Sequence, residues 1–421
     1  MKHLELHIIQ SVPVACLNRD DLNSPKTAVF GGVQRARVSS QSWKSAIREF
    51  AKDNDSNNNQ FKGNRSRRMV CELATRLEKN EIAKDVAVII AEHVAGIVET
   101  LDSKLDADGY KKIKTMMFFS IAEYDAIANA VKAEIVSAAE QVKSSISAIE
   151  AQKEASKKLA DEKQQEAAKK ELDRLEKELD KDKKALLKAF NDKAIKDAIK
   201  SVQLKDAADI ALFGRMVAND HSLSVEAASM FSHVLSTHKA DNEIDFFAAV
   251  DDLQATEDSG AGMTGTLEFN SATYYRFAAL NLDMLADADH LGSMTSEERK
   301  SVVRAFIDAT IKAVPIARKY TMNGNTLPVY VLGVVREKGH PIQLVNAFES
   351  PVRHSQNGFA VESINRMNLE YGDIKETWGI DSLFAKAVVK SSLKEQTQKD
   401  LGKVETCSFD DMLNGMVAHV I

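Results

Sequence analysis

The sequence predicts an α+β protein, in which strands near both ends of the chain flank a long helical region. Residues 4–10 alternate apolar and polar side chains in the manner of a strand. Residues 110–213 contain no glycine and no proline and are rich in Ala, Lys, Glu and Leu, which favours helix. Residues 329–335 form an apolar run typical of a buried strand. We therefore expect the first strand to join a sheet that is completed much later in the chain.

The composition is that of a cytoplasmic protein with a substantial core. The chain has 421 residues, enough for two or three domains or for one domain with large insertions. It has no apolar run of about 18 residues, and its first residues lack the apolar core of a signal peptide, so we expect no membrane span. Cys16, Cys71 and Cys407 lie far apart, which favours reduced thiols and argues against a zinc site.

A short strand and a capped helix are predicted after the first strand. A loop rich in Asn, Asp, Ser and Pro leads to Gly31-Gly32, where the backbone can adopt conformations that other residues resist. Residues 36–38 are expected to form the strand. Ser39 and Ser40 then precede residues 41–48, which have the pattern of a helix with a serine cap.

Residues 131–204 are predicted to form a long antiparallel helical hairpin. Two apolar stripes at helical spacing flank residues 153–170, which are almost entirely Ala, Lys, Glu and Gln. The stripes consist of Val142, Ile146 and Ile149, and of Leu172, Leu175, Leu179 and Leu186. No turn residue marks the reversal, so one uninterrupted helix is the alternative.

Strands are predicted again in the last part of the chain, where glycine returns. Residues 267–269 and 272–277 have strand character. Residues 302–314 have the pattern of a helix that ends at Pro315, and the buried strand at residues 329–335 follows.

Residues 22–48 are the strongest candidate for a binding segment. They contain no Asp or Glu in a chain with 62 acidic residues, so nothing nearby in sequence neutralises their cations. Clustered Arg and Lys bind phosphates, and a helix N-terminus adds N–H groups and a favourable dipole. The alternative is the solvated basic face of an ordinary loop. The candidate residues are Lys26, Arg35, Arg37, Lys44 and Arg48, with Ser39, Ser40 and Gln41 as neutral donors.

A second segment, residues 309–336, is also free of acidic residues. It forms either the opposite wall of the same groove or a basic loop that balances acidic neighbours. Its cations are Lys312, Arg318, Lys319 and Arg336.

Phe246 and Phe247 are adjacent aromatic residues close to the glycine-rich residues 259–265. Adjacent side chains point to different faces of any regular element, so one exposed ring can wedge between nucleic-acid bases. The alternative is that both rings fill a core. Met216, which follows Gly214 closely, is either an adaptable apolar contact or a core residue beside a turn.

The sequence offers little for catalysis. No P-loop, GxGxxG or GxSxG motif is present, and the ten histidines are scattered. Asp20-Asp21 and Asp251-Asp252 are paired carboxylates, which can hold Mg²⁺ but more often cap turns or lie in water. We expect a protein that is not an enzyme and needs no cofactor.

Several motifs follow one another in an order typical of a known family. The early ones are Cys16-Leu17-Asn18-Arg19-Asp20-Asp21, Phe30-Gly31-Gly32 and Arg35-Ala36-Arg37-Val38-Ser39-Ser40-Gln41-Ser42-Trp43-Lys44. The later ones are Asp209-Ile210-Ala211-Leu212-Phe213-Gly214-Arg215-Met216, Thr237-His238, Asp245-Phe246-Phe247-Ala248-Ala249-Val250-Asp251-Asp252-Leu253, Tyr275-Arg276, Val314-Pro315 and Asn346-Ala347-Phe348-Glu349. Together they resemble the CasC family, the Cas-seven group of type I-E CRISPR Cascade complexes.

The resemblance implies a modified RNA-recognition-motif (ferredoxin-like) palm, a helical fingers domain and a β-hairpin thumb. The palm would comprise residues 1–54 and 205–421, the fingers residues 55–204 and the thumb about residues 240–272. Several copies would polymerise head to tail along one guide RNA (crRNA), beside other Cascade subunits. Each thumb would displace one base at regular intervals and leave the bases between free to pair with target DNA. Type I-E backbones are not nucleases, but related subunits of other CRISPR types cut RNA with a loop aspartate, so the alternative is a metal-dependent ribonuclease that uses Asp20 or Asp21.

The resemblance also assigns roles to individual residues. Met216, Phe246 and Phe247 would brace the kink in the guide; family relatives can carry Trp where Phe246 stands, and stacking is still possible there. The segment 131–204 is longer than the family leads us to expect, and it is a decoration, a contact to a neighbouring subunit or extra surface for target DNA. A purely structural coiled-coil scaffold built on this segment is a further alternative. The implied contacts to guide phosphates are Arg19, Lys26, Arg37, Ser39, Gln41, Lys44 and Arg48.

Overall fold

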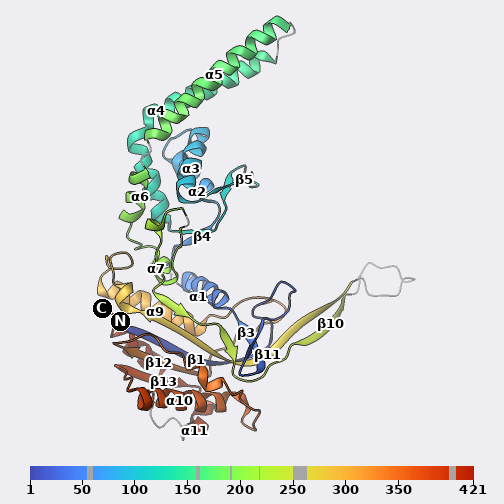
Figure 1. The fold of residues 1–421 in the computed structure, drawn as a ribbon, viewed down its shortest axis with the longest axis vertical. Coiled ribbons are helices and arrows are strands. Elements are labelled where there is room, and N and C mark those ends of the chain that lie inside the picture. The colour runs from blue at the N-terminus through green and yellow to red at the C-terminus, as the bar shows by residue number, and fades with distance from the viewer. Residues whose placement is uncertain (55–59, 158–161, 190–191, 218, 250–262, 398–403) are drawn as a thin grey trace, which may run out of the picture. The chain divides into compact units, whose positions relative to one another are not determined.

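The computed structural model describes the chain as two compact units (Figure 1). Unit 1 comprises Met1–Asn59, Ala228–Asp287 and Met294–Ile421, and unit 2 comprises Gln60–Ala227 and Ala288–Ser293. No helix in the described ranges is both long and apolar enough to cross a membrane. The described residues are 1–54, 60–157, 162–189, 192–217, 219–249, 263–397 and 404–421.

Unit 1 is built on a ten-stranded, mostly antiparallel sheet (Figure 1). The main strand order is β14-β13-β12-β1-β11-β9-β3-β2, and β8 and β10 also pair with β11. A mixed α+β fold was predicted and is confirmed. The strands are β1 (His3–Ala15), β2 (Thr27–Phe30), β3 (Val33–Val38), β8 (Ser229–Phe231), β9 (Val234–Ser236), β10 (Glu243–Ala249), β11 (Met263–Asn281), β12 (Tyr330–Arg336), β13 (Phe384–Val389) and β14 (Glu405–Thr406).

The first strand, β1, lies in the interior of this sheet. It pairs antiparallel with β11, where His3 is opposite Asn281, and with β12, where His3 is opposite Arg336. The prediction that the first strand joins a sheet completed much later is therefore confirmed. The two strands predicted at residues 267–269 and 272–277 are parts of the single long strand β11.

Both faces of β1 are buried over residues 3–10, so the polar side chains there need partners inside the protein. The Glu5 carboxylate lies 3.1 Å from His3 Nε2, 3.3 Å from His7 Nε2 and 3.3 Å from Arg336 Nε. It also accepts a hydrogen bond from the backbone N–H of Ile342 at 3.0 Å. Polar residues therefore alternate along β1 because they form an internal network, and not because one face meets water.

Helices cover both faces of the sheet. Leu332 of β12 belongs to one core cluster with Tyr371 of α10. The next residue, Gly333, points to the opposite face, where a Cβ atom would come within 2.5 Å of Met416 Sδ in α12. The helices of unit 1 are α1 (Ser40–Asn54), α8 (Leu282–Leu285), α9 (Ser296–Lys312), α10 (Gly358–Trp378), α11 (Lys394–Thr397) and α12 (Phe409–Val417), with short 3-10 turns at Val345–Phe348 and Ser391–Leu393.

Unit 2 is mainly helical and has its own apolar core. Val70 and Leu73 of α2 and Ile90 and Val94 of α3 are fully buried in this core. Its helices are α2 (Met69–Lys79), α3 (Lys84–Val98), α4 (Ile121–Ser156), α5 (Glu162–Ala189), α6 (Asp192–Ser201) and α7 (Ala208–Phe213), with a 3-10 turn at His221–Leu223. Two small sheets pair β4 (Asn64–Ser66) with β7 (Met117–Phe119) and β5 (Leu101–Leu105) with β6 (Lys111–Ile113).

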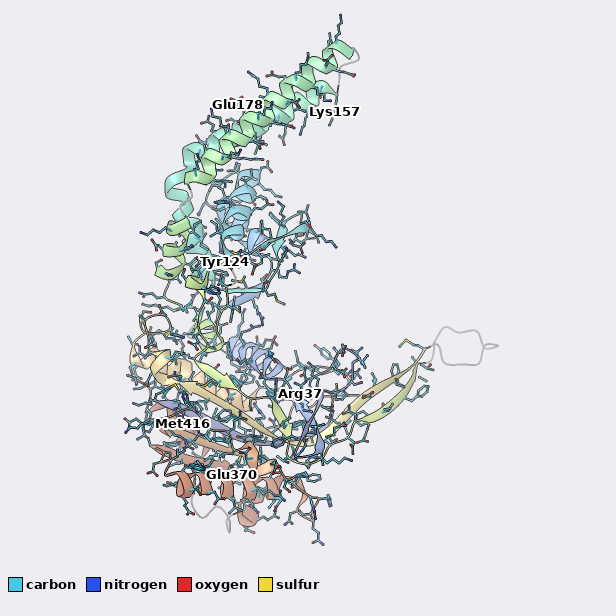
Figure 2. The ribbon with its side chains drawn as sticks, viewed as in Figure 1. Arg37, Tyr124, Lys157, Glu178, Glu370 and Met416 are labelled. Atoms are coloured by element: carbon cyan, nitrogen blue, oxygen red, sulfur yellow. The ribbon has the colours of Figure 1, made fainter. Side chains whose placement is uncertain are left out.

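The two longest helices, α4 and α5, run antiparallel. Ser145 Oγ of α4 donates to Asp182 of α5 at 2.7 Å, and Lys153 Nζ lies 3.8 Å from Glu176. Residue numbers therefore rise along one helix as they fall along the other, so the segment is not one uninterrupted helix (Figure 2 shows Lys157 and Glu178 on this pair). α4 begins at Ile121, ten residues before the predicted start of the hairpin, because Ser120 and Glu123 form a capping box.

Residues 205–227 belong to unit 2, whereas the sequence placed them with the later part of the chain. Asp209 of α7 accepts a hydrogen bond from the Gly63 N–H at 3.2 Å. Arg215 Nη1 lies 2.7 Å from Glu123, and both side chains are buried. These contacts are distant in sequence, so the local composition after residue 204 does not reveal them.

Candidate nucleic-acid interface

The N-terminus of α1 is fixed by its serine cap and by the preceding loop. Ser39 Oγ accepts a hydrogen bond from Ser42 N at 3.2 Å, which confirms the predicted cap. The Ser39 N–H in turn donates to Asn18 Oδ1 at 2.9 Å. Ser39 is therefore occupied as a cap, while Ser40 is half-buried and Gln41 is exposed at the first turn.

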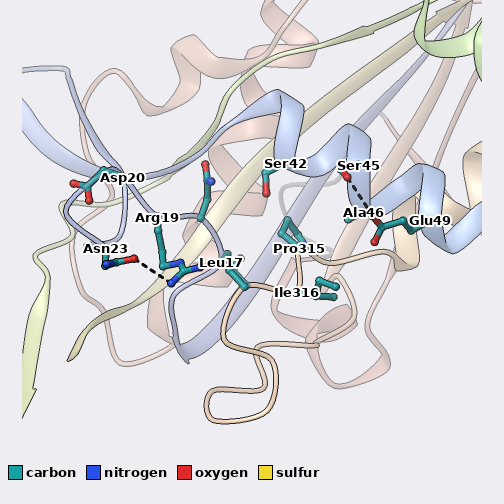
Figure 3. A pocket seen from close by; sticks show the side chains of 12 residues that line it. Leu17, Arg19, Asp20, Asn23, Ser42, Ser45, Ala46, Glu49, Pro315 and Ile316 are labelled. Atoms are coloured by element: carbon teal, nitrogen blue, oxygen red, sulfur yellow. Dashed lines mark hydrogen bonds between the residues drawn. The ribbon is translucent and has the colours of Figure 1, made fainter. Parts of the chain in front are cut away.

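The loop before β2 presents Arg19 to solvent. Asp20 Oδ1 accepts hydrogen bonds from the N–H groups of Leu22 and Ser24, both at 2.9 Å, and so closes a tight turn. Arg19 Nη1 donates to Asn23 Oδ1 at 3.1 Å across the same turn (Figure 3). The exposed guanidinium keeps free donors that can meet a phosphate.

The remaining cations of this region are half-buried. Arg37 Nε donates to the Thr27 carbonyl at 3.3 Å, and the Lys26 N–H donates to the Asn18 carbonyl at 3.0 Å. Lys44 Nζ lies 5.5 Å from the centre of the Phe231 ring, and burial lowers the pKa of this lysine. Lys26 and Arg37 thus precede α1, and Lys44 and Arg48 lie in its second and third turns.

Arg35 is a correction to the predicted site, because it is fully buried. Its guanidinium donates to the carbonyls of Phe30 at 3.1 Å, Ser236 at 3.0 Å and Phe348 at 2.7 Å. A side chain that satisfies three separate backbone segments is not available to a phosphate. Arg35 therefore holds the β2–β3 hairpin in place instead of contacting a ligand.

The second acid-free segment faces the first across two adjoining cavities of about 390 Å³ and 530 Å³. Ser42 and Glu49 of α1 lie on one side of the first cavity, and Pro315 and Ile316 on the other (Figure 3). The structure thus places the two segments on opposite walls, which is one of the two arrangements that the sequence left open. The walls are not purely basic, because Asp20, Glu49 and Asp53 also line them.

Arg318 and Lys319 take different positions on this second wall. Arg318 is half-buried, with φ at 53°, and its Nη2 donates to the Asn23 carbonyl at 3.4 Å. Lys319 is exposed, and its Nζ lies 5.7 Å from the ring centre of Tyr320. Tyr320 itself is 97% exposed beside the larger cavity, a position that the sequence analysis did not single out.

β10 and β11 form a two-stranded ribbon that separates the two adjacent aromatic rings. Phe246 is opposite Thr266 and is 66% exposed. Phe247 is opposite Gly265 and is only half-exposed. The expectation that the two rings point to different faces is therefore confirmed. The pair Asp251-Asp252 and most of the glycine-rich residues 259–265 lie outside the described residues.

The charge of this ribbon is a signal that the sequence analysis missed. Residues 240–275 contain no Lys and no Arg, whereas Asp241, Glu243, Asp245 and Glu268 lie on or beside the ribbon. An acidic surface repels phosphates. The ribbon is thus suited to contact bases through Phe246 and to keep the phosphate chain away.

Met216 belongs to unit 2 and is 78% exposed. It follows Gly214, whose φ is 80°, and the buried ion pair between Arg215 and Glu123 fixes the backbone beside it. Its exposure fits an apolar contact to a ligand and not a core position. Among the described residues, no three His, Cys, Asp or Glu side chains are grouped so that they could hold a metal ion.

Comparisons with known proteins give one matching family and two solved structures with a similar fold. The model of the family described as "CT1975-like protein" matches residues 4–415. A chain of a solved structure described as "CRISPR RNA-guided surveillance complex, pre-nicking" is 25% identical, with a TM-score of 0.75 and 100% of both chains covered. A chain of another, described as "CRISPR RNA-guided surveillance complex", shares the fold at 23% identity, a TM-score of 0.67 and 99% coverage of both chains. No curated protein matches.

Proposed function

As a member of the CT1975-like protein family, to which it belongs over residues 4–415, this chain is, we propose, a guide-RNA-binding backbone subunit of a CRISPR surveillance complex. We assign it to type I-E, to the CasC (Cas-seven) group, and to the cytoplasm. Several copies polymerise head to tail along the spacer of one crRNA, next to other subunits of the complex. The guide is presented to target DNA for base pairing.

The observation that carries this proposal is the arrangement of cations around the start of α1. Arg19 lines the cavity beside the start of α1, whose cap is already satisfied, and Lys319 lies on the opposite wall. Lys26 and Arg37 precede this helix in the same acid-free segment. Cations and N–H groups arranged in this way hold a phosphate chain and leave the bases unread. A backbone subunit needs contacts that do not depend on the bases, because one protein must bind guides of every sequence.

The ribbon of β10 and β11 supports the thumb role. Phe246 offers an exposed ring for stacking, and the absence of cations from residues 240–275 disfavours contact with phosphates. A ribbon that stacks on a base and repels the phosphate chain would hold that base away from the rest of the guide. The guide would therefore be kinked at this base. In this proposal the sheet of unit 1 is the RRM-like palm, and unit 2, which carries the exposed Met216, is the fingers.

We also propose that the chain is not a nuclease. Asp20 Oδ1 already accepts two backbone hydrogen bonds, so this carboxylate has a structural task in its turn. An assembled complex should leave RNA complementary to the guide intact in Mg²⁺. Cleavage that disappears in Asp20→Ala would overturn this part of the proposal.

The kink is tested by scanning the guide with the fluorescent base 2-aminopurine, placed at each spacer position in turn. The assembled complex should give bright signals at regular intervals, where a base is displaced from its stack. Phe246→Ala should remove the bright positions, whereas Thr264→Ala, on an exposed part of the same ribbon, should keep them. A guide with uniform signal along the spacer contradicts the proposal.

A further inference from the structure

A chain of side-chain hydrogen bonds joins the root of the β10–β11 ribbon to the basic loop. Tyr274 OH donates to Asn270 Oδ1 at 3.3 Å, and Asn270 Nδ2 donates to Asn242 Oδ1 at 3.1 Å. Asn242 Nδ2 then donates to the Pro25 carbonyl at 3.2 Å. This network of hydrogen bonds therefore runs from the buried part of β11 to the loop that carries Arg19 and Lys26.

The Asn242 amide can take only one orientation in this network. Its Nδ2 also donates to Glu268 Oε2 at 3.2 Å, so both of its hydrogens are used. Reversing the amide would place its oxygen against the Pro25 carbonyl and the Glu268 carboxylate. The side chain is thus specified as a donor to two acceptors and an acceptor from Asn270, a combination that aspartate cannot provide.

The network lies where the ribbon leaves the main sheet. The last residue pair between β1 and β11 joins Ala15 and Asn270, and β11 continues beyond it paired with β10 alone. A two-stranded ribbon has little stiffness of its own, so contacts at its root set its direction. The Ala240 N–H bonded to the Gln34 carbonyl at 3.1 Å is one such contact, and the asparagine chain is another.

The two ends of the network are next to the two proposed RNA contacts. Pro25 precedes Lys26 and pairs with Arg19 across the loop. Asn242 immediately precedes β10, the strand that carries Phe246. Both Asn270 and Tyr274 are buried, so the inner end of the hydrogen-bond network is anchored in the core.

We propose that Asn242 and Asn270 are positioning residues that fix the ribbon to the Pro25 loop and so set the separation between the phosphate contacts and Phe246. This inference rests on the proposed function. The separation determines which base is displaced for a given phosphate register. Neither asparagine needs to touch the RNA.

The test is the 2-aminopurine scan of the guide, made on complexes assembled with Asn242→Asp. Aspartate keeps the shape of the side chain but loses the bonds to Pro25 and faces the Glu268 carboxylate. We expect the ratio of displaced to stacked base at the bright positions to fall about fivefold, because one or two hydrogen bonds are lost. The fluorescence should also spread to the adjacent spacer positions. The salt dependence of RNA binding should stay as in the wild type, because the phosphate contacts are intact.

Glu268→Gln is the matched control, since its side-chain oxygen still accepts from Asn242 and the wild-type scan should persist. If Asn242→Asp does not assemble, Tyr274→Phe removes only the hydroxyl at the inner end and should broaden the scan in the same direction. If the Asn242→Asp complex, or the Tyr274→Phe complex used in its place, gives the same fluorescence pattern as the wild type, the inference is overturned. A uniform scan from the wild-type complex overturns the proposed function itself, and this inference with it.

Discussion

The ring of Phe247 lies over Gly265 on the neighbouring strand, where a Cβ atom would come within 2.6 Å of the Phe247 Cζ. The glycine makes room for one aromatic ring on one face of the ribbon. Because side chains alternate along a strand, Phe246 must then project from the other face. One glycine thus determines which of two adjacent rings packs and which is exposed.

Gly265→Ala should weaken the ribbon. Replacing glycine in a strand normally stabilises it, so a loss of stability would show that the added methyl displaces Phe247. We expect a local cost of about 1 kcal/mol, seen as faster hydrogen exchange at the β10 amides. Thr264→Ala, at an exposed neighbouring position, is the control. Slower exchange in Gly265→Ala would show that the ring does not depend on this space.

Arg35 and Arg37 should differ in how much they contribute to the stability of the fold. Arg35→Lys leaves buried carbonyls without donors, and we expect the free energy of unfolding to fall by on the order of 3 kcal/mol in urea denaturation. Arg37→Lys should change it little, since Arg37 makes one longer backbone contact and is half-buried. Equal effects of the two substitutions would contradict the structural role of Arg35.

The Glu5 network should make stability depend on pH. Burial alone would raise the pKa of the Glu5 carboxyl, but hydrogen bonds from His3 and His7 and the charge of Arg336 outweigh it and hold this pKa well below its ordinary value. Such a carboxylate stabilises the fold above its unfolded pKa of about 4.3, and the contribution is lost as the pH falls toward the folded pKa.

Glu5→Gln should therefore lower the free energy of unfolding at pH 7 by on the order of 3 kcal/mol, because His3, His7 and Arg336 lose their buried partner. The difference from the wild type should shrink as the pH is lowered below about 4. Chemical denaturation across this pH range measures both quantities. A difference that stays constant or grows in acid would mean that the Glu5 charge is not what stabilises the network.

Arg37→Gln combined with Lys44→Gln should change the salt dependence of RNA binding. Each lost phosphate contact reduces the slope of log affinity against log salt by about 0.7 for a single strand, so the pair should reduce it by about 1.4. Lys375→Gln is the control and should leave the slope unchanged, because Lys375 is an exposed lysine of α10 that pairs with Asp381. An unchanged slope in the double variant would show that this face of α1 does not hold phosphates.

The sequence predicted those parts of the fold that local patterns determine. The serine cap at Ser39, the helix after it and the buried strand β12 each follow from a few adjacent residues. That β1 joins a sheet completed much later was predicted because strands appeared at the two ends of the chain, whereas its interior position in that sheet is shown by the structure. The hairpin of α4 and α5 followed from composition, although its start at Ile121 depends on a capping box that the composition does not reveal.

The rest depends on contacts between distant residues. Arg35 and Arg37 are equivalent in local sequence, and only the carbonyls of Ser236 and Phe348 show that Arg35 is buried. The link from Asn242 to Pro25 joins residues 217 positions apart in the sequence, with most of unit 2 between them, and carries no motif. The exposure of Tyr320 is likewise a property of the folded loop. The acidic character of residues 240–275, in contrast, was readable from the sequence and would have strengthened the case for a base-contacting thumb.

The most direct test of the central claim is native mass spectrometry of the protein co-expressed with its complex partners and guide RNAs of increasing spacer length. The account predicts particles that hold several copies of this chain on one guide, with one further copy for each fixed increase in spacer length. A single RNA-free chain in the presence of all partners and guides would contradict it.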